Sequence, residues 1–188
     1  LLVGVLGGLT FLLAAFVLPV SIALLLSMAA TLLVTGAFHE DGLADAVDGF
    51  GGGWTKPQVL TIMKDSRIGS YAAIAVALML LAKFNTLYEL PDAWIAPAIV
   101  AAHAASRFCS TALIHALDYV RDDDSSRAKP LAVRMGTGGL AVAGLFGLAP
   151  LALLPWQAAG AGLLLAALTT FLAARYFVKR IGGYTGDC

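Results

Sequence analysis

Long apolar segments with few charges constrain the fold of this chain more than any other feature of its sequence. Hydrophobic residues make up 60% of the 188 positions and charged residues 13%, and the mean hydropathy is +0.86. A helix needs ~20 apolar residues to cross a ~30 Å hydrocarbon core, and in lipid its backbone must bond internally. We therefore predict an all-α fold, a polytopic membrane helix bundle of about six transmembrane helices embedded in membrane lipid. The six apolar segments are residues 1–18, 20–38, 70–90, 94–117, 138–154 and 156–178.

The charges of the connecting segments predict the orientation of these helices. Basic residues occur in segments 39–69, 118–137 and 179–188, whereas the three intervening connections, each with a proline, carry none. By the positive-inside rule the basic segments are cytoplasmic. We expect one transmembrane domain over residues 1–188, multi-pass in the cell (inner) membrane, with its active-site loops in those three segments. The net charge of zero does not suggest nucleic acid as a partner, and the oligomeric state is left open.

The most informative motif is an acidic cluster. Four carboxylates, those of Glu40, Asp41, Asp45 and Asp48, fall within nine residues. The i, i+4, i+7 spacing of the three aspartates places them on one face of a helix, where they repel one another unless a cation intervenes. Oxygen ligands suit Mg²⁺, which usually takes one or two carboxylates plus substrate phosphates. We therefore predict a Mg²⁺–phosphate site here, with a solvated acidic loop as the alternative.

A second polar motif, KDSRIG at residues 64–69, precedes the third apolar segment. Arg67 and Lys64 are suited to neutralise phosphate oxygens, arginine as a planar fork and lysine as a point charge. Asp65 either joins the metal site or holds Arg67. The alternative is an anchor at the membrane interface with Ser70 as a helix N-cap.

Charged or titratable residues also lie well inside the third and fourth apolar segments. Arg107 is about ten residues, or ~15 Å, from the end of its segment, and so near the membrane midplane. Because a charge there is costly, we expect Arg107 to face a cavity within the bundle and to meet an anion. For His103, one turn earlier, we expect an interhelical hydrogen bond. For Lys83, a functional role and snorkelling to the outer interface stay equally open.

The last motif is GGYTGD at residues 182–187, just past the sixth apolar segment. Glycines beside a hydroxyl and a carboxylate suit close backbone approach to a phosphate, and Asp187 is a further candidate metal ligand. Tyr119 and Arg121 follow the fourth apolar segment on the same side of the membrane. A flexible tail is the alternative for residues 182–187.

In their order along the chain, these motifs resemble those of the cobalamin-5′-phosphate synthases, the adenosylcobinamide-GDP ribazoletransferases. The resemblance implies an Mg²⁺-dependent transferase of cobalamin biosynthesis. Its reaction joins α-ribazole, or its 5′-phosphate, to adenosylcobinamide-GDP, and yields adenosylcobalamin (or its 5′-phosphate) and GMP. Family members are longer at both ends, so we expect this chain to be an internal fragment of a longer protein. The segments that carry the resemblance are 39–53, 64–69, Arg107, Tyr119-x-Arg121 and 182–187.

The resemblance also gives the motif residues expected roles. Catalysis is expected to depend on acidic side chains, one of which accepts the proton of the attacking ribazole hydroxyl: Glu40, Asp41, Asp45, Asp48 and Asp65. Mg²⁺ is expected at four aspartates: Asp41, Asp45, Asp48 and Asp187. Substrate is expected to contact polar side chains from all the motifs: His39, Lys64, Arg67, Arg107, Tyr119, Arg121 and Thr185.

Three other functions agree less well with the sequence. CDP-alcohol phosphotransferases also carry clustered aspartates, but their usual pattern is Asp-Gly-x-x-Ala-Arg, whereas here Asp41-Gly42 is followed by Leu43-Ala44-Asp45 without that arginine. A transporter would place its polar residues near the midplane, and here only Arg107 and Lys83 fit that description. A purely structural membrane subunit would not need an aspartate face.

Overall fold

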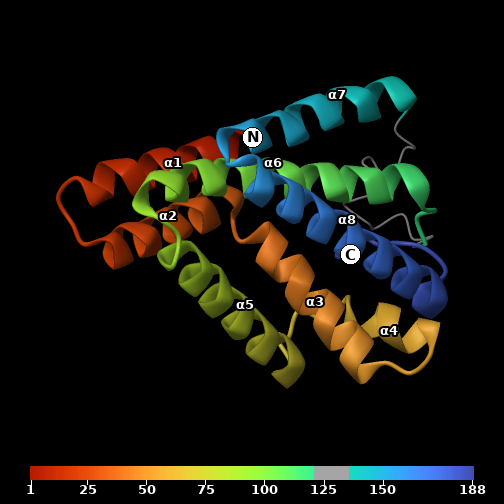
Figure 1. The fold of residues 1–188 in the computed structure, drawn as a ribbon. Helices are drawn as coiled ribbons and strands as arrows, with labels where there is room; N and C mark the ends of the chain where they lie inside the picture. The colour runs from red at the N-terminus through yellow and green to blue at the C-terminus, as the bar shows by residue number, and fades with distance from the viewer. Residues whose placement is uncertain (121–135) are drawn as a thin grey trace.

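The computed structural model describes residues 1–120 and 136–188, and within these ranges the chain is helical with no strand, as predicted. Figure 1 shows the helices as one elongated bundle, with the α1–α2 and α5–α6 turns at its left end and α4 and the ends of α6 and α8 at its right. The elements in chain order are α1 (Leu2–Ala15), α2 (Val20–Thr35), α3 (Phe38–Gly52), α4 (Lys56–Ile62), α5 (Ser70–Tyr88), α6 (Asp92–Ala116), α7 (Thr137–Leu148), the 3-10 helix η2 (Ala149–Leu153) and α8 (Trp156–Ile181).

The apolar helices have the lengths and surfaces of a membrane bundle. Among the described residues, α5 and α8 are long and apolar enough to cross a membrane, and α2 with α3 forms a bent pair that makes a third span if counted as one. Helix α1 and the α7–η2 stretch are apolar but shorter. A continuous apolar surface of this kind fits lipid rather than water. On α8 it is formed by exposed side chains: Leu163, Leu164, Leu165, Leu168, Phe171 and Leu172.

The second apolar segment does not continue to residue 38 as one helix, and this corrects the prediction. Gly36 and Ala37 both adopt left-handed backbone conformations, with φ of 62° and 55°. The amide of Ala37 donates to the carbonyl of Leu32 (2.8 Å), which closes α2 in a Schellman-type C-cap. The chain then turns by 84° and continues as α3. Residues 39–69, expected as a loop, are therefore mostly helix.

Small residues let α1 pack closely against α2 and α6. A Cβ atom on Gly7 would lie 2.7 Å from Cγ2 of Thr31, and one on Gly4 would lie 2.9 Å from Cβ of His103. The Ser27 hydroxyl donates to the Gly7 carbonyl at 2.7 Å. Such contacts replace the missing hydrophobic driving force between helices in lipid. They fix His103 and the rest of α6 beside α1.

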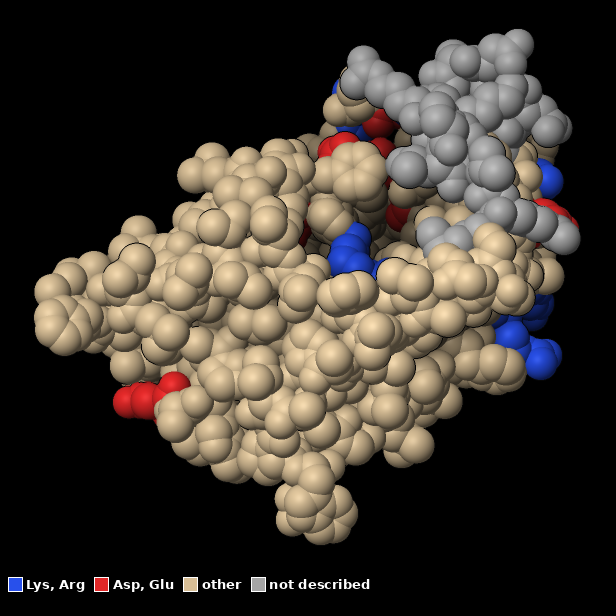
Figure 2. Space-filling model, turned by 90° about the horizontal axis from the view of Figure 1, so that it is seen from above, with Lys and Arg blue, Asp and Glu red and all other residues tan. Residues whose placement is uncertain are grey.

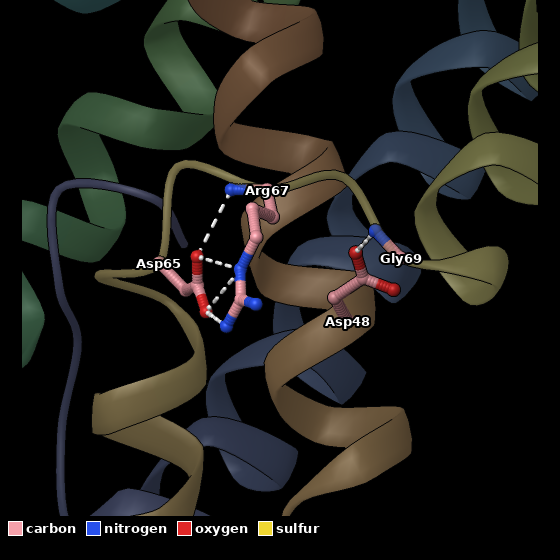
Figure 3. A network of polar contacts seen from close by, with 4 residues as sticks. All are labelled: Asp48, Asp65, Arg67 and Gly69. Atoms are coloured by element: carbon pink, nitrogen blue, oxygen red, sulfur yellow. Dashed lines mark hydrogen bonds and ion pairs between the residues drawn. The ribbon is translucent and has the colours of Figure 1, made fainter.

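Helix α3 supplies the N-terminal cap of α5. The carboxylate of Asp48 accepts backbone N–H bonds from Gly69 (2.6 Å) and Ala72 (2.9 Å), the first of which is drawn in Figure 3. A carboxylate on the orphan amides at a helix N-terminus is favoured by both the hydrogen bonds and the helix dipole. The approach is so close that a Cβ on Gly69 would lie 2.6 Å from Oδ1 of Asp48. Gly69 therefore makes room for Asp48.

The C-terminal end of α3 is also held by α8. The Arg180 guanidinium donates to the carbonyls of Gly53 (2.6 Å) and Phe50 (3.2 Å), and so caps the C-terminus of α3. Its carbon Cζ lies 5.6 Å from the centre of the Phe50 ring, which stacks on Phe177. A cation at a helix C-terminus interacts favourably with the last carbonyls. Two neighbouring helices thus fix the position of α3.

We predict that Gly69→Ala lowers the stability of the protein by about 1–3 kcal/mol, because the new methyl group would displace the Asp48 carboxylate from the start of α5. The measurement is the free energy or midpoint of unfolding in detergent. Gly162→Ala is the matched control, since a Cβ there meets nothing within 4 Å. Equal stability of the two variants would contradict the role given to Asp48.

Candidate functional site

A cavity of about 400 Å³ lies between α3, α6, the end of α8 and the C-terminal residues, and we call it the larger cavity. Seen from above, Figure 2 shows acidic and basic side chains inside a hollow whose walls are mostly uncharged. The structure thus brings together predicted site residues from distant parts of the chain. Those that line the larger cavity are His39, Arg107, Tyr119, Thr185 and Asp187.

The glycine pair of the C-terminal motif is required by the backbone of the chain itself. Gly182 ends α8 with a φ of 88°. A Cβ on Gly183 would lie 2.1 Å from the Asp118 carbonyl oxygen, so only glycine fits there. The amide of Tyr184 donates to Asp118 and the Tyr184 carbonyl accepts from Val120, both at 3.0 Å. The motif is therefore tied to the end of α6, and the alternative of a flexible tail is wrong.

The two polar residues of that motif have different settings. Thr185 is 1% exposed, and its hydroxyl accepts a hydrogen bond from the amide of Asp187 at 3.3 Å. We therefore infer that the Thr185 hydroxyl holds the end of the chain in place and does not contact a substrate directly. The backbone of Asp187 lies against α3, where a Cβ on Gly42 would be 3.5 Å from the Asp187 Cα. Asp187 therefore stands next to the turn of α3 that carries Asp41 and Asp45.

Two tyrosines close the larger cavity on the side of the C-terminal motif. Tyr119 and Tyr184 pair edge to face, with ring centres 5.4 Å apart. Burial, and to a smaller extent Tyr119, raise the pKa of the Tyr184 hydroxyl above its ordinary value. Tyr184 is therefore neutral at physiological pH and is able to donate a hydrogen bond into the cavity. Arg121, predicted beside Tyr119, lies outside the described residues.

A second, smaller cavity of about 300 Å³ lies deeper in the bundle and shares Arg107 with the larger one. The cavity expected around Arg107 is thus present. Lys83 also lines the smaller cavity, which favours a functional role over snorkelling to the outer interface. The hydrogen bond expected for His103 is not found, since its buried Nε2 has no partner among the described residues, and that prediction was wrong.

The aspartate face points away from the larger cavity. At about 100° per residue, Asp41, Asp45 and Asp48 fall within about 60° of one another on α3, as predicted. His39 and Leu43, which line the larger cavity, fall on the opposite face of the same helix. The single site expected from the sequence is therefore two groups of residues on two sides of α3. Asp187 stands at the edge between them.

The linker between α4 and α5 lies along the aspartate side of α3, as Figure 3 shows for Asp65, Arg67 and Asp48. The Arg67 side chain forms a two-pronged hydrogen-bonded ion pair with Asp65, so of the two roles left open for Asp65 the structure shows the one that holds Arg67. Hydrogen bonds from Arg67 lower the pKa of Asp65 to about 2. Arg67 itself is exposed, as is Lys64 on the same linker.

The aspartate face of α3 supplies part of the ligand set that a Mg²⁺ ion needs. In the described part of the chain, no group of three or more His, Cys, Asp or Glu side chains is placed to hold a metal ion. Both oxygens of Asp48 already accept backbone hydrogen bonds. Two further carboxylates, those of Asp41 and Asp45, stand one turn apart on α3, and the backbone of Asp187 lies against the same helix. That set fits Mg²⁺, which usually takes one or two carboxylates and completes its shell with substrate phosphates and water.

Some residues of the two cavities were not selected from the sequence. Thr31 and Thr35 of α2 line the smaller cavity, and Ser110 and Tyr184 line the larger one. The available signal was the spacing of the two threonines, which stand one turn apart in an otherwise apolar segment. Arg180 lies in the basic segment 179–188, and nothing in the sequence indicates its contacts with the end of α3.

Comparison with known proteins gives the same family as the order of the motifs. The chain matches the family model for cobalamin-5-phosphate synthase over residues 1–188. It is 48% identical over 191 residues to the adenosylcobinamide-GDP ribazoletransferase of Shewanella frigidimarina, covering 100% of this chain and 73% of that protein. The enzyme of the same name from Vibrio parahaemolyticus is 45% identical over 192 residues, covering 100% of this chain and 71% of that protein. No solved structure matches. The chain therefore belongs to the cobalamin-5-phosphate synthase family.

Proposed function

We propose that this protein is an adenosylcobinamide-GDP ribazoletransferase. It joins α-ribazole, or its 5′-phosphate, to adenosylcobinamide-GDP, and the products are adenosylcobalamin, or its 5′-phosphate, and GMP. The observation that supports this most directly is the larger cavity, where Arg107, Tyr119 and Asp187 meet from three parts of the chain. Family membership over the whole chain favours this reaction over that of a CDP-alcohol phosphotransferase or transport.

The chemistry needs little more than positioning and charge neutralisation. The oxygen of a ribazole hydroxyl forms a bond to the pyrophosphate phosphorus nearest the corrinoid. The bond from that phosphorus to the bridging oxygen breaks, and GMP leaves with that oxygen. Charge builds on the phosphate oxygens, and Arg107 is suited to neutralise it with its planar fork. The proton of the hydroxyl passes to a carboxylate of α3, with Glu40, Asp41 and Asp45 as the candidates.

We propose that Mg²⁺ is held by Asp41 and Asp45, with Asp187 beside them, and by phosphate oxygens of the substrate. The ion would neutralise the pyrophosphate and orient it for displacement. Lys64 and Arg67 lie on the same side of α3 and would hold the nucleotide phosphate. Arg67 would do so by exchanging its contact with Asp65 for the phosphate.

We propose further that the protein is a multi-pass protein of the inner cell membrane with its active face toward the cytoplasm. The basic segments support this orientation, because Lys56, Lys64, Lys179 and Arg180 belong to α4, its linker or the end of α8. Helix α4 and the end of α8 lie at one end of the bundle in Figure 1, opposite the α5–α6 turn. Nucleotide substrates are cytoplasmic, which agrees with a cytoplasmic site.

We predict that Asp41→Asn and Asp45→Asn each lower Mg²⁺-dependent GMP release by at least about 100-fold in the full-length enzyme, because each removes a charge from the metal site. The measurement is GMP release from adenosylcobinamide-GDP in membranes, with and without Mg²⁺. Asp92→Asn, at the start of α6, is the control and should leave turnover unchanged. Normal turnover by both α3 variants would remove these aspartates from the metal site.

We predict that Arg107→Lys lowers kcat/KM for adenosylcobinamide-GDP by about 10- to 100-fold, since it keeps the charge but loses the fork. Arg107→Leu should lower it further, with an unfolding midpoint no lower than that of the wild type, because removing a buried charge need not destabilise. Arg175→Lys on α8 is the control, as Arg175 lies over Phe171. Arg107→Leu with normal kinetics would overturn the role of Arg107.

We predict that a cysteine at Trp54, which is 90% exposed, reacts with a membrane-impermeant maleimide only from the cytoplasmic side. A cysteine at Asp92, at the other end of the bundle, should react only from outside. The measurement uses single-cysteine variants of the full-length protein, in which Cys109 and Cys188 are replaced, in intact cells and inverted vesicles. Labelling of both positions from one side would contradict the proposed topology.

A further inference from the structure

The smaller cavity is a polar chamber inside an otherwise apolar bundle. Its charged and imidazole side chains come from three helices: His39 and Glu40 from α3, Lys83 from α5, and His103 and Arg107 from α6. His39, Leu43 and Arg107 line both cavities, so this set forms the boundary between them. The chamber therefore adjoins the candidate site but has its own walls.

Two atoms in the chamber have unused hydrogen-bonding capacity. Oε2 of Glu40 and Nε2 of His103 are buried and have no hydrogen-bond partner in the described part of the chain. A buried polar atom without a partner destabilises the folded protein, so native proteins rarely keep one unless water, an ion or a ligand completes it. A ligand with hydroxyl groups would satisfy both atoms, by donating to Glu40 and by pairing with the imidazole of His103.

The charges of the chamber favour an anionic ligand. Lys83 and Arg107 bring two positive charges and Glu40 brings one negative charge, and the Glu40 carboxylate attracts both cations. One positive charge is left over in a bundle where an uncompensated charge is costly. A ligand that carries both hydroxyl groups and an anionic group fits this arrangement.

The size of the chamber distinguishes between the two substrates of the proposed reaction. Its volume of about 300 Å³ is at the lower end of the ~300–1,000 Å³ that small-molecule sites enclose. A nucleotide joined to a corrinoid is far larger than a base joined to a ribose. Only the smaller substrate fits, and the larger cavity, which Asp187 lines, is left for the pyrophosphate of the other.

We propose that this chamber binds the hydroxyl-bearing acceptor, α-ribazole or its 5′-phosphate, and that Lys83 and His103 are residues that determine its binding. The assignment rests on the proposed function. The acceptor's hydroxyl groups lie at Glu40 and His103, and its phosphate, when present, pairs with Lys83. Arg107 at the boundary then faces the pyrophosphate in the larger cavity, so that the two substrates meet there.

The test measures equilibrium binding to the full-length protein in lipid nanodiscs, with α-ribazole 5′-phosphate, α-ribazole and adenosylcobinamide-GDP as separate probes. Lys83→Met should weaken binding of α-ribazole 5′-phosphate by about 10- to 100-fold, the effect of losing a charge-assisted hydrogen bond, and that of α-ribazole much less. His103→Leu should weaken binding of both acceptors. Both variants should bind adenosylcobinamide-GDP as the wild type does.

Lys179→Met is the matched control, because Lys179 is exposed at the end of α8, and it should bind all three probes normally. Acceptor affinities unchanged in both chamber variants would overturn the proposal, and so would a loss that falls on adenosylcobinamide-GDP instead. The proposed function is tested separately by GMP release from the wild type. Absence of GMP release with intact, Lys83-dependent acceptor binding would contradict the function and support the chamber assignment.

Discussion

The cations inside the apolar bundle are the constraint on which the rest of this structure depends. Arg107 and Lys83 need a counter-charge or water, and α5 and α6, which carry them, hold no acidic residue beyond Asp92 in the first turn of α6. The counter-charge comes from Glu40, on a helix that would continue away from them if α2 ran straight on. The turn at Gly36 and Ala37 prevents this and directs α3 alongside α5, so that Glu40 reaches the cavity that Lys83 and Arg107 line.

The position of α3 is set by charged groups at helix ends rather than by a large apolar core. Asp48 accepts hydrogen bonds from the first amides of α5, and Arg180 donates to the last carbonyls of α3 itself. Charge-assisted hydrogen bonds are roughly twice as strong as neutral ones. Helix termini carry backbone amides and carbonyls that have no partner within the helix, so charged side chains can bind there. The buried cluster around α3 is correspondingly small, with Val59, Met63 and Ile181 at its centre.

The sequence was a good guide to the helices and a weaker one to the site. The apolar segments became helical because lipid leaves the backbone no other partner, although the second segment ends its helix at Thr35 and the fifth passes from α7 into the 3-10 helix η2. The aspartate face was also predictable, since it depends only on helical spacing. The direction of that face was not predictable, because it follows from the bend at residues 36–37. No proline marks this bend, and it requires a left-handed backbone conformation at Ala37. Nor did the spacing show that Asp48 would be used by α5, because its partner lies 21 residues further along the chain.

The opposite faces of α3 have a mechanical consequence. A helix of 15 residues is a rigid body, so it cannot turn its aspartates without also turning His39 and Glu40. If an ion or a phosphate bound at the aspartates and shifted α3, the same movement would displace His39 and Glu40. Such coupling between two sites is reciprocal. The hydrogen bonds of Asp48 to the start of α5 and of Arg180 to the end of α3 limit how far the helix moves.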